Sequence, residues 1–283
     1  MAFLVGALAD PLRYDFFVRA LVASAMVGAV CVVIGTYVVL KGLAFLGDAI
    51  SHATFPGVVA AYLLKGPFYV GAVVAAVGTA LAIGWVARRA TLRTDTAIGV
   101  LFAGTFALGV FMFSRIEGYV ADLFALLFGN VLAIGSDDLV ALVALAATVL
   151  TIIVVLWKEL LYATFDPLGA AATGLRVGWL EALFLGLVAV TIVVSLQAVG
   201  IILVVAMLVT PAATAQLVAS RFPVLMALSL ALGVSAAVAG LYISYWLDAA
   251  SGATIVLVET LLFAVALLAG PSRGFLRRRP SAR

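Results

Sequence analysis

The sequence has little charge, one cysteine and one histidine. Only 10% of its 283 residues are charged, whereas 66% are hydrophobic. In an ordinary soluble domain about a quarter of the residues are charged. This composition therefore excludes a soluble domain and indicates a protein that crosses a membrane several times. A single cysteine, Cys31, excludes an intrachain disulfide, and its apolar surroundings favour a core filler over a metal ligand.

Motifs for ATP binding and for hydrolytic catalysis are also missing. No GxxxxGK[ST] phosphate loop, HExxH or GxSxG pattern occurs, so any ATP-driven motion needs a partner ATPase. We therefore expect no catalytic residue and no cofactor belonging to the chain. The net charge of +3 does not indicate nucleic-acid binding, because the basic residues fall at span ends and in the tail. We also expect no cleaved targeting segment.

Long apolar segments predict an all-α polytopic membrane protein with about 8–10 transmembrane helices in one domain, residues 1–283. A tenth stretch, 119–132, has only 14 residues and contains Asp122 and Asn130, so its length favours a re-entrant or interfacial segment. The nine long segments are 16–40, 43–64, 68–87, 96–113, 139–157, 179–196, 198–219, 224–247 and 253–270.

The distribution of basic residues leaves the topology open. Nine spans with the amino end outside place twelve basic residues inside and four outside, and ten spans with both ends inside give the same ratio. Segment length favours nine. Both versions place the loop 158–178 and the basic tail 271–283 in the cytoplasm, where the tail would lie beside anionic lipid headgroups.

The segment from Gly42 to Leu64 carries polar residues in an otherwise apolar run. Asp48 and His52 are four residues apart, so a helix places them on one face. Pro56 lacks an N–H and leaves the carbonyl of His52 without its helical partner. His52 also falls close to the middle of its segment, so the pair is expected near the bilayer centre.

Ionisable groups at that depth cost about 2.5–3.5 kcal/mol each and commonly mark a transport path. An imidazole and a carboxylate suit a first-row divalent ion such as Zn²⁺ or Mn²⁺ better than Ca²⁺. The sequence therefore predicts a metal site at Asp48 and His52. The alternative is a hydrogen-bonded pair that only fixes two helices.

Three further residues are candidates for lining such a path: Ser51, Thr210 and Glu259. Thr210 precedes Pro211, a second helix break, and paired breaks in a transporter are typical of a central binding site. A packing kink explains Pro211 equally well. For Glu259, a structural hydrogen bond to a neighbouring helix is as good an explanation as a place on the path.

The cytoplasmic loop is expected to contain a short helix whose surface consists mostly of small side chains. Asp166 is expected to cap it, with Pro167 at its first position, and Gly174 is expected to end it. Small residues, Gly169 and Ala171 among them, cover it. Such a helix suits docking into a groove of another protein, although a connector without a partner would have the same pattern.

Six blocks in this order resemble the permease subunits of bacterial zinc/manganese ABC importers: LKGLAFLGDAISHATFPGV, DTAIGVLFAGTFALG, LFGNVLAI, FDPLGAAATGL, LQAVGIILVVAMLVTPAATAQL and SGATIVLVETLLF. The resemblance implies a permease like the larger, type II ABC importers, located in the bacterial inner membrane. It implies a second permease copy, cytoplasmic ATPase subunits that use ATP and Mg²⁺, and an extracytoplasmic metal-binding protein.

The same resemblance implies that Asp48 and His52 line the metal path and that the loop 158–178 couples the chain to the ATPase. It assigns nothing to Glu259. Two other classes remain open: a secondary transporter, either metal-carrying or proton-coupled, that needs no ATP, and a membrane scaffold, which would not explain the polar pair. Zinc and manganese are both compatible with the pair.

Overall fold

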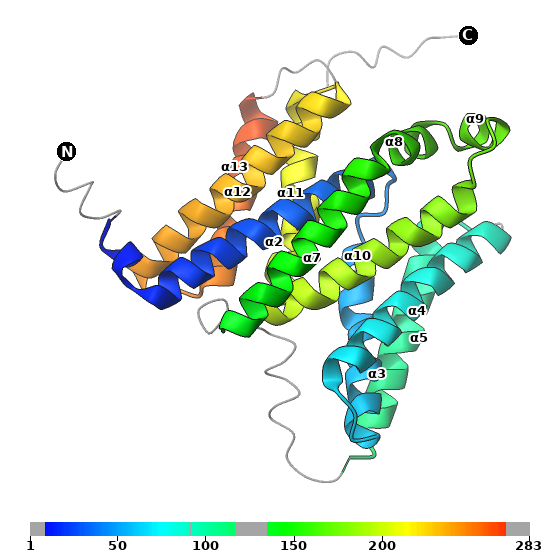
Figure 1. Cartoon of the computed structure of the whole chain (residues 1–283), viewed down its shortest axis with the longest axis horizontal. Helices are drawn as coiled ribbons and strands as arrows, with labels where there is room; N and C mark the ends of the chain where they lie inside the picture. Colours follow the sequence, from blue (N-terminus) through cyan, green and yellow to red (C-terminus); the bar gives the residue numbers. More distant parts are fainter. Residues whose placement is uncertain (1–8, 91, 117–134, 270–283) are drawn as a thin grey trace.

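The computed structural model describes residues 9–90, 92–116 and 135–269. Within these ranges the chain is helical, without a strand (Figure 1), which confirms the all-α prediction. The elements are η1 (Pro11–Arg13), α2 (Asp15–Leu40), α3 (Leu46–Leu63), α4 (Phe68–Arg89), α5 (Thr94–Phe113), α7 (Ser136–Val155), α8 (Trp157–Phe165), α9 (Pro167–Ala172), α10 (Val177–Val199), α11 (Ile201–Val218), α12 (Phe222–Leu247) and α13 (Ser251–Ala269).

Nine of these helices are long, and they coincide with the nine predicted segments. Eight are long and apolar enough to cross a membrane. The ninth, α3, has 18 residues but is less apolar because it carries Asp48, His52 and Pro56. The expectation of about 8–10 transmembrane helices is thus confirmed.

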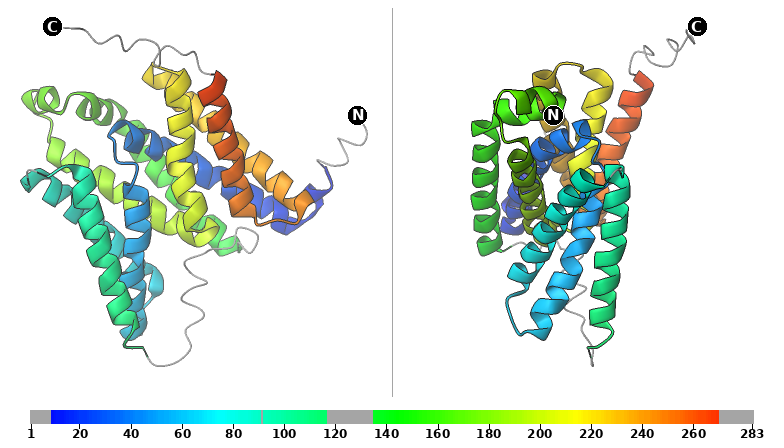
Figure 2. Two further views of the ribbon diagram at one scale, coloured as in Figure 1. Left: turned by 180° about the vertical axis from the view of Figure 1, so that it is seen from behind. Right: turned by 90° about the vertical axis from the view of Figure 1, so that its right-hand side faces the viewer.

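The long helices place their ends on two faces of the bundle. Residues 119–132 lie outside the described residues, but α5 ends and α7 begins on the same face (Figures 1 and 2). The described helices therefore favour the nine-span topology. In this topology one face carries α8 and α9 together with a set of basic residues near helix ends: Lys41, Arg88, Arg89, Arg93, Lys158, Arg176 and Arg221. The positive-inside rule makes that face cytoplasmic.

The helices form two groups that α10 connects. Helices α3, α4 and α5 pack against one another, and α11, α12 and α13 do the same, with α2 against α11 and α12. Helix α10 packs against α4 and α3 on one side and against α2 and α7 on the other, as the left view of Figure 2 shows. Helix α10 is therefore in contact with both groups.

Glycines allow the closest helix crossings. A Cβ atom at Gly57 of α3 would collide with the backbone of Gly71 of α4, and one at Gly35 of α2 would collide with the backbone at Leu208 of α11. Inside a bilayer, helices associate through such close packing because lipid is as apolar as their side chains. These glycines therefore fix the distances between α3 and α4 and between α2 and α11.

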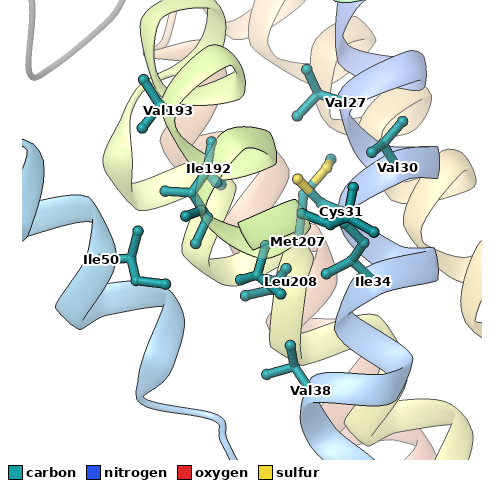
Figure 3. Close-up of a cluster of buried hydrophobic side chains, with 14 of the residues drawn as sticks. Val27, Val30, Cys31, Ile34, Val38, Ile50, Ile192, Val193, Met207 and Leu208 are labelled. Carbon is teal, nitrogen blue, oxygen red and sulfur yellow. The ribbon is translucent and has the colours of Figure 1, made fainter. Parts of the chain in front are cut away.

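The core lies where α2, α10 and α11 meet. Cys31 and Ile34 of α2 face Met207 and Leu208 of α11 (Figure 3), and all four are fully buried. The Cys31 thiol donates to the hydroxyl of Ser195 at 3.9 Å between Sγ and Oγ. The interpretation of Cys31 as a core filler agrees with this position.

Candidate functional site

The Asp48 and His52 side chains lie on one face of α3, as their spacing predicts. Their nearest atoms, Asp48 Oδ1 and His52 Nε2, are 3.5 Å apart, and the side chains are 46% and 34% exposed. Asp48 is in the first turn of α3 and His52 one turn further. Asp48 thus lies near the cytoplasmic end of α3, and His52 lies one turn closer to the middle of this 18-residue helix.

Two phenylalanines of α5 flank the imidazole. The ring centroids of Phe102 and Phe106 are 5.4 Å and 5.5 Å from that of His52. They cover part of the imidazole, while both side chains of the pair remain partly exposed.

Pro56, where the sequence predicts a helix break, lies inside α3, and the helix continues through it to Leu63. Proline has no N–H to offer the carbonyl of His52, so this oxygen lacks its usual helical donor four residues further along the chain. Pro56 packs against Gly109 of α5, where a Cβ atom would come within 3.0 Å of the proline ring. The break is thus held in place by the neighbouring helix.

Asp95, which the sequence analysis missed, lies beside this pair. Asp48 and Asp95 line the same hollow of about 170 Å³ between the cytoplasmic ends of α3 and α5, together with Phe102. Asp95 also lies 3.9 Å from Arg93, measured from Oδ2 to Nη2. A sequence signal existed, since Asp95, Phe102 and Phe106 follow a spacing that places them on one face of α5.

One copy of the chain supplies few metal ligands. In the part of the chain that the structure describes, no group of three or more His, Cys, Asp or Glu side chains could hold a metal ion. The pair therefore offers one imidazole nitrogen and one carboxylate. Water, the carbonyl of His52 or a second protein chain would have to complete the coordination of a first-row ion.

The other path-lining candidates lie elsewhere. Ser51 is fully buried and donates to the carbonyl of Gly47 at 2.8 Å, so its hydroxyl does not share the exposed face of the pair. Thr210 is half-buried on α11, and its carbonyl accepts from Thr214 Oγ1 at 2.7 Å. Glu259 is 2% exposed on α13, which packs against α11 and α12 and not against α3 to a comparable extent. Thr210 and Glu259 thus lie on other helices than the pair, and Ser51, although next to His52 in the chain, directs its hydroxyl to the Gly47 carbonyl.

The cytoplasmic loop folds locally as its sequence predicts. Asp166 caps α9 by accepting from the backbone N–H of Gly169 at 2.8 Å, and Pro167 is the first helical residue. Gly174 follows the helix at φ 88°, a conformation that favours glycine. Leu168 is 83% exposed at the tip of this helix. Helix α9 therefore presents a small, bare surface on the cytoplasmic face.

A second hollow, of about 290 Å³, lies on the same face and extends from Lys41 to Pro167 and Glu181. Burial lowers the pKa of Lys41, and the nearby Glu181 carboxylate opposes this shift. Glu181 Oε2 also lies 3.3 Å from Arg88 Nη1. In the described ranges this is the only ion pair between two long helices, and it joins α4 to α10.

Comparisons with known proteins agree with this arrangement. The ABC 3 transport family matches residues 13–270. The chain is 46% identical over 267 residues to the manganese transport system membrane protein MntC of Halalkalibacterium halodurans, covering 94% of this chain and 91% of that protein. It is 39% identical over 268 residues to the chelated iron transport system membrane protein YfeD of Yersinia pestis, covering 95% and 90%.

A solved structure has the same fold. PsaBC from Streptococcus pneumoniae in complex with Fab superposes with a TM-score of 0.82 at 34% sequence identity, covering 96% of this chain and 98% of that chain. The helices that carry the pair, the loop and the buried Glu259 therefore belong to an arrangement that is shared over almost the whole length.

Proposed function

Because the chain belongs to the ABC 3 transport family and is the permease subunit of an ATP-driven importer of divalent first-row metal ions in the bacterial plasma membrane, we propose that manganese is its main cargo. The high identity to a manganese permease supports this choice. Zinc remains the alternative, since an imidazole and a carboxylate can hold either ion.

The exposed Asp48–His52 pair is the observation on which the proposed metal path rests. Both side chains are accessible on one face of α3, and among the described residues one copy has no group of three or more His, Cys, Asp or Glu side chains for a metal ion. Two copies that face each other would supply two carboxylates and two imidazoles. We therefore place the path between two copies of the chain, with the ion binding in transit to Asp48 and His52.

A path site must release its ion as well as bind it. Few protein ligands and some retained water keep the binding weak enough for release. The pair contains no thiolate, which would hold a soft metal more firmly. Protons compete with the metal for the imidazole and the carboxylate, so uptake is expected to fall in acid.

The route by which ATP moves the path runs through α9 and α10. We assign α9 with its flanking residues, from Asp166 to Gly174, as the docking element for a cytoplasmic ATPase, because its side chains are mostly small and it is exposed on the cytoplasmic face. Helix α10 begins directly after it and packs against α4 and α3. Displacement of α9 would thus reach the helix that carries Asp48 and His52.

The test is uptake into proteoliposomes that contain the chain, its ATPase and its extracytoplasmic binding protein. Radioactive manganese and zinc are compared for the wild type, Asp48→Ala and the control Asp15→Ala, an exposed carboxylate at the start of α2. We expect ATP-dependent uptake, with manganese preferred, that only Asp48→Ala abolishes. Uptake without ATP would indicate a secondary transporter, whereas ATP-driven uptake by Asp48→Ala would reject the site.

A further inference from the structure

Glu259 is a buried acid for which the metal path provides no role. It lies near the midpoint of α13, at 2% exposure. Neither of its carboxyl oxygens has a hydrogen-bond partner in the described part of the chain. The structural hydrogen bond that would have explained this residue is therefore not formed among the described residues.

Titratable groups around Glu259 are few. Helix α13 packs against α11 and α12, and α11 contains no ionisable side chain. Helix α12 has only Tyr242 and Tyr245, near its C-terminal end, where their rings contact Phe17 of α2. The thiol of Cys31 on α2 is close enough to interact electrostatically with Glu259. No Lys or Arg forms an ion pair with the carboxyl among the described residues.

Such surroundings select the neutral form of the acid. An ionised carboxylate that is buried without a cation or hydrogen-bond donors is costly, and the group takes up a proton instead. The thiol of Cys31 does not change this, because its hydrogen is directed to Ser195. In the packed arrangement of α11, α12 and α13, Glu259 is therefore expected to carry a proton.

The helix beside it has a point at which it can bend. Pro211 removes one internal hydrogen bond of α11, at the carbonyl of Met207. A Cβ atom at Gly233 of α12 would lie 3.4 Å from the ring of Pro211, so this break faces the helix that also packs against α13. Bending of α11 at this point would change its packing against α12 and α13, the helix that carries Glu259.

We propose that Glu259 is a proton-binding site, which holds a proton while α11, α12 and α13 are packed as in this structure and releases it when these helices separate and water reaches the carboxyl. Protons then favour the packed conformation. Because one proton is exchanged, the equilibrium between the packed and the hydrated conformation changes by up to about tenfold per pH unit. Only the transport readout of this proposal rests on the proposed function.

The first experiment detects the proton directly. Infrared spectra of the permease–ATPase complex in lipid nanodiscs are compared for the wild type, Glu259→Gln and the control Asp15→Asn. We expect the carbonyl stretch of a protonated carboxylic acid in the wild type and in Asp15→Asn, and its loss in Glu259→Gln. If Glu259→Gln does not assemble, Glu259→Leu serves as the second variant. Absence of a band attributable to Glu259 at neutral pH would overturn the proposal, whether or not the complex transports metal.

The second experiment measures the coupling. ATP-driven uptake is recorded from neutral to alkaline pH for the wild type and Glu259→Gln, whose amide mimics the protonated acid. We expect uptake by the wild type to change with pH over the range in which its infrared band disappears, and uptake by Glu259→Gln to be independent of pH there. Identical pH profiles would show that the proton has no influence on the transport cycle and would reject the coupling.

Discussion

Asp48 and Glu259, two acidic side chains within the described helices, differ in exposure and in their partners. Asp48 lies on an open face of α3, 46% exposed and beside His52. Glu259 lies inside the other helix group, 2% exposed and without a hydrogen-bond partner among the described residues. An accessible carboxylate beside an imidazole can exchange a metal ion, whereas an enclosed and unpartnered one can exchange only a proton. Accessibility, rather than residue type, separates the two roles.

The largest effect is expected from removing a ligand of the accessible site. His52→Ala leaves a single carboxylate of the pair per copy. Removing a residue that only hydrogen-bonds to a metal ligand typically lowers metal affinity about 10–100-fold, and removing a ligand itself is expected to cost at least as much. We therefore expect ATP-driven uptake to fall by about a hundredfold or more. The measurement is initial uptake rate in proteoliposomes.

His52→Gln is the matched variant, since it keeps a polar side chain of similar reach. It should restore only a small part of the uptake. Full activity of His52→Ala would mean that the accessible pair is a structural contact, and the contrast with Glu259 would disappear.

The second-largest effect is expected from changing α9, which we propose transfers motion from the ATPase to Asp48 and His52. Ala171→Glu adds charge and bulk to the exposed surface of α9, while leaving the Asp166 cap intact. Gly169 is less suitable, because a Cβ atom there collides with the Asp166 side chain. We expect roughly tenfold less uptake per ATP hydrolysed, equivalent to about 1.4 kcal/mol.

The measurement for this variant is the ratio of metal taken up to phosphate released. Ser220→Glu, on the same face but between α11 and α12, is the control and should keep the ratio of the wild type. Normal coupling in Ala171→Glu would remove the assignment of α9 as the docking helix.

Much of this arrangement could be predicted from local sequence. The i,i+4 spacing predicts the Asp48–His52 pair, and Asp166 with Pro167 predicts the start of α9, because these features depend only on neighbours along one helix. The burial of Ser51 could not be derived, since it depends on which face of α3 meets other helices. The hollow shared by Asp48 and Asp95 depends on how α3 and α5 are aligned along each other. The sequence of either helix alone does not determine this alignment.

Asp95 offers a smaller effect that tests this shared hollow. A second carboxylate near the pair attracts a divalent cation, but partial exposure and solvent reduce its contribution to about 1 kcal/mol. Asp95→Asn is therefore expected to lower uptake by about threefold to tenfold at low metal concentration and to have little effect at saturation. The rate is measured as a function of metal concentration.

Asp10→Asn, near the amino end and close to Arg13 with 3.9 Å between Asp10 Oδ1 and Arg13 Nη1, is the control for Asp95→Asn, because Asp95 has a similar arginine neighbour. An equal change in both variants would attribute the effect to general surface charge. An unchanged rate in Asp95→Asn would restrict the metal path to Asp48 and His52.

The smallest effect is expected at the contact between Arg88 and Glu181, which joins the group of the accessible site to α10. The two side chains are 42% and 40% exposed, and pairs of this kind contribute about 0.2–1 kcal/mol. Glu181→Gln should therefore change coupling by less than about fivefold. It also removes the charge that opposes the lowered pKa of Lys41, so Lys41 should lose its proton at a lower pH in this variant.

Exchanging the two charges between Arg88 and Glu181 tests whether the contact between them matters or only the individual charges. Arg88→Glu and Glu181→Arg should each impair coupling more than Glu181→Gln, since each places like charges together, and the double reversal should recover most of the loss. Recovery would mean that α4 and α10 move as one unit through this pair. Without recovery, packing between α10 and α4 must carry the motion to Asp48 and His52 by itself, and the ion pair would be only a surface contact at the cytoplasmic end of the two helices.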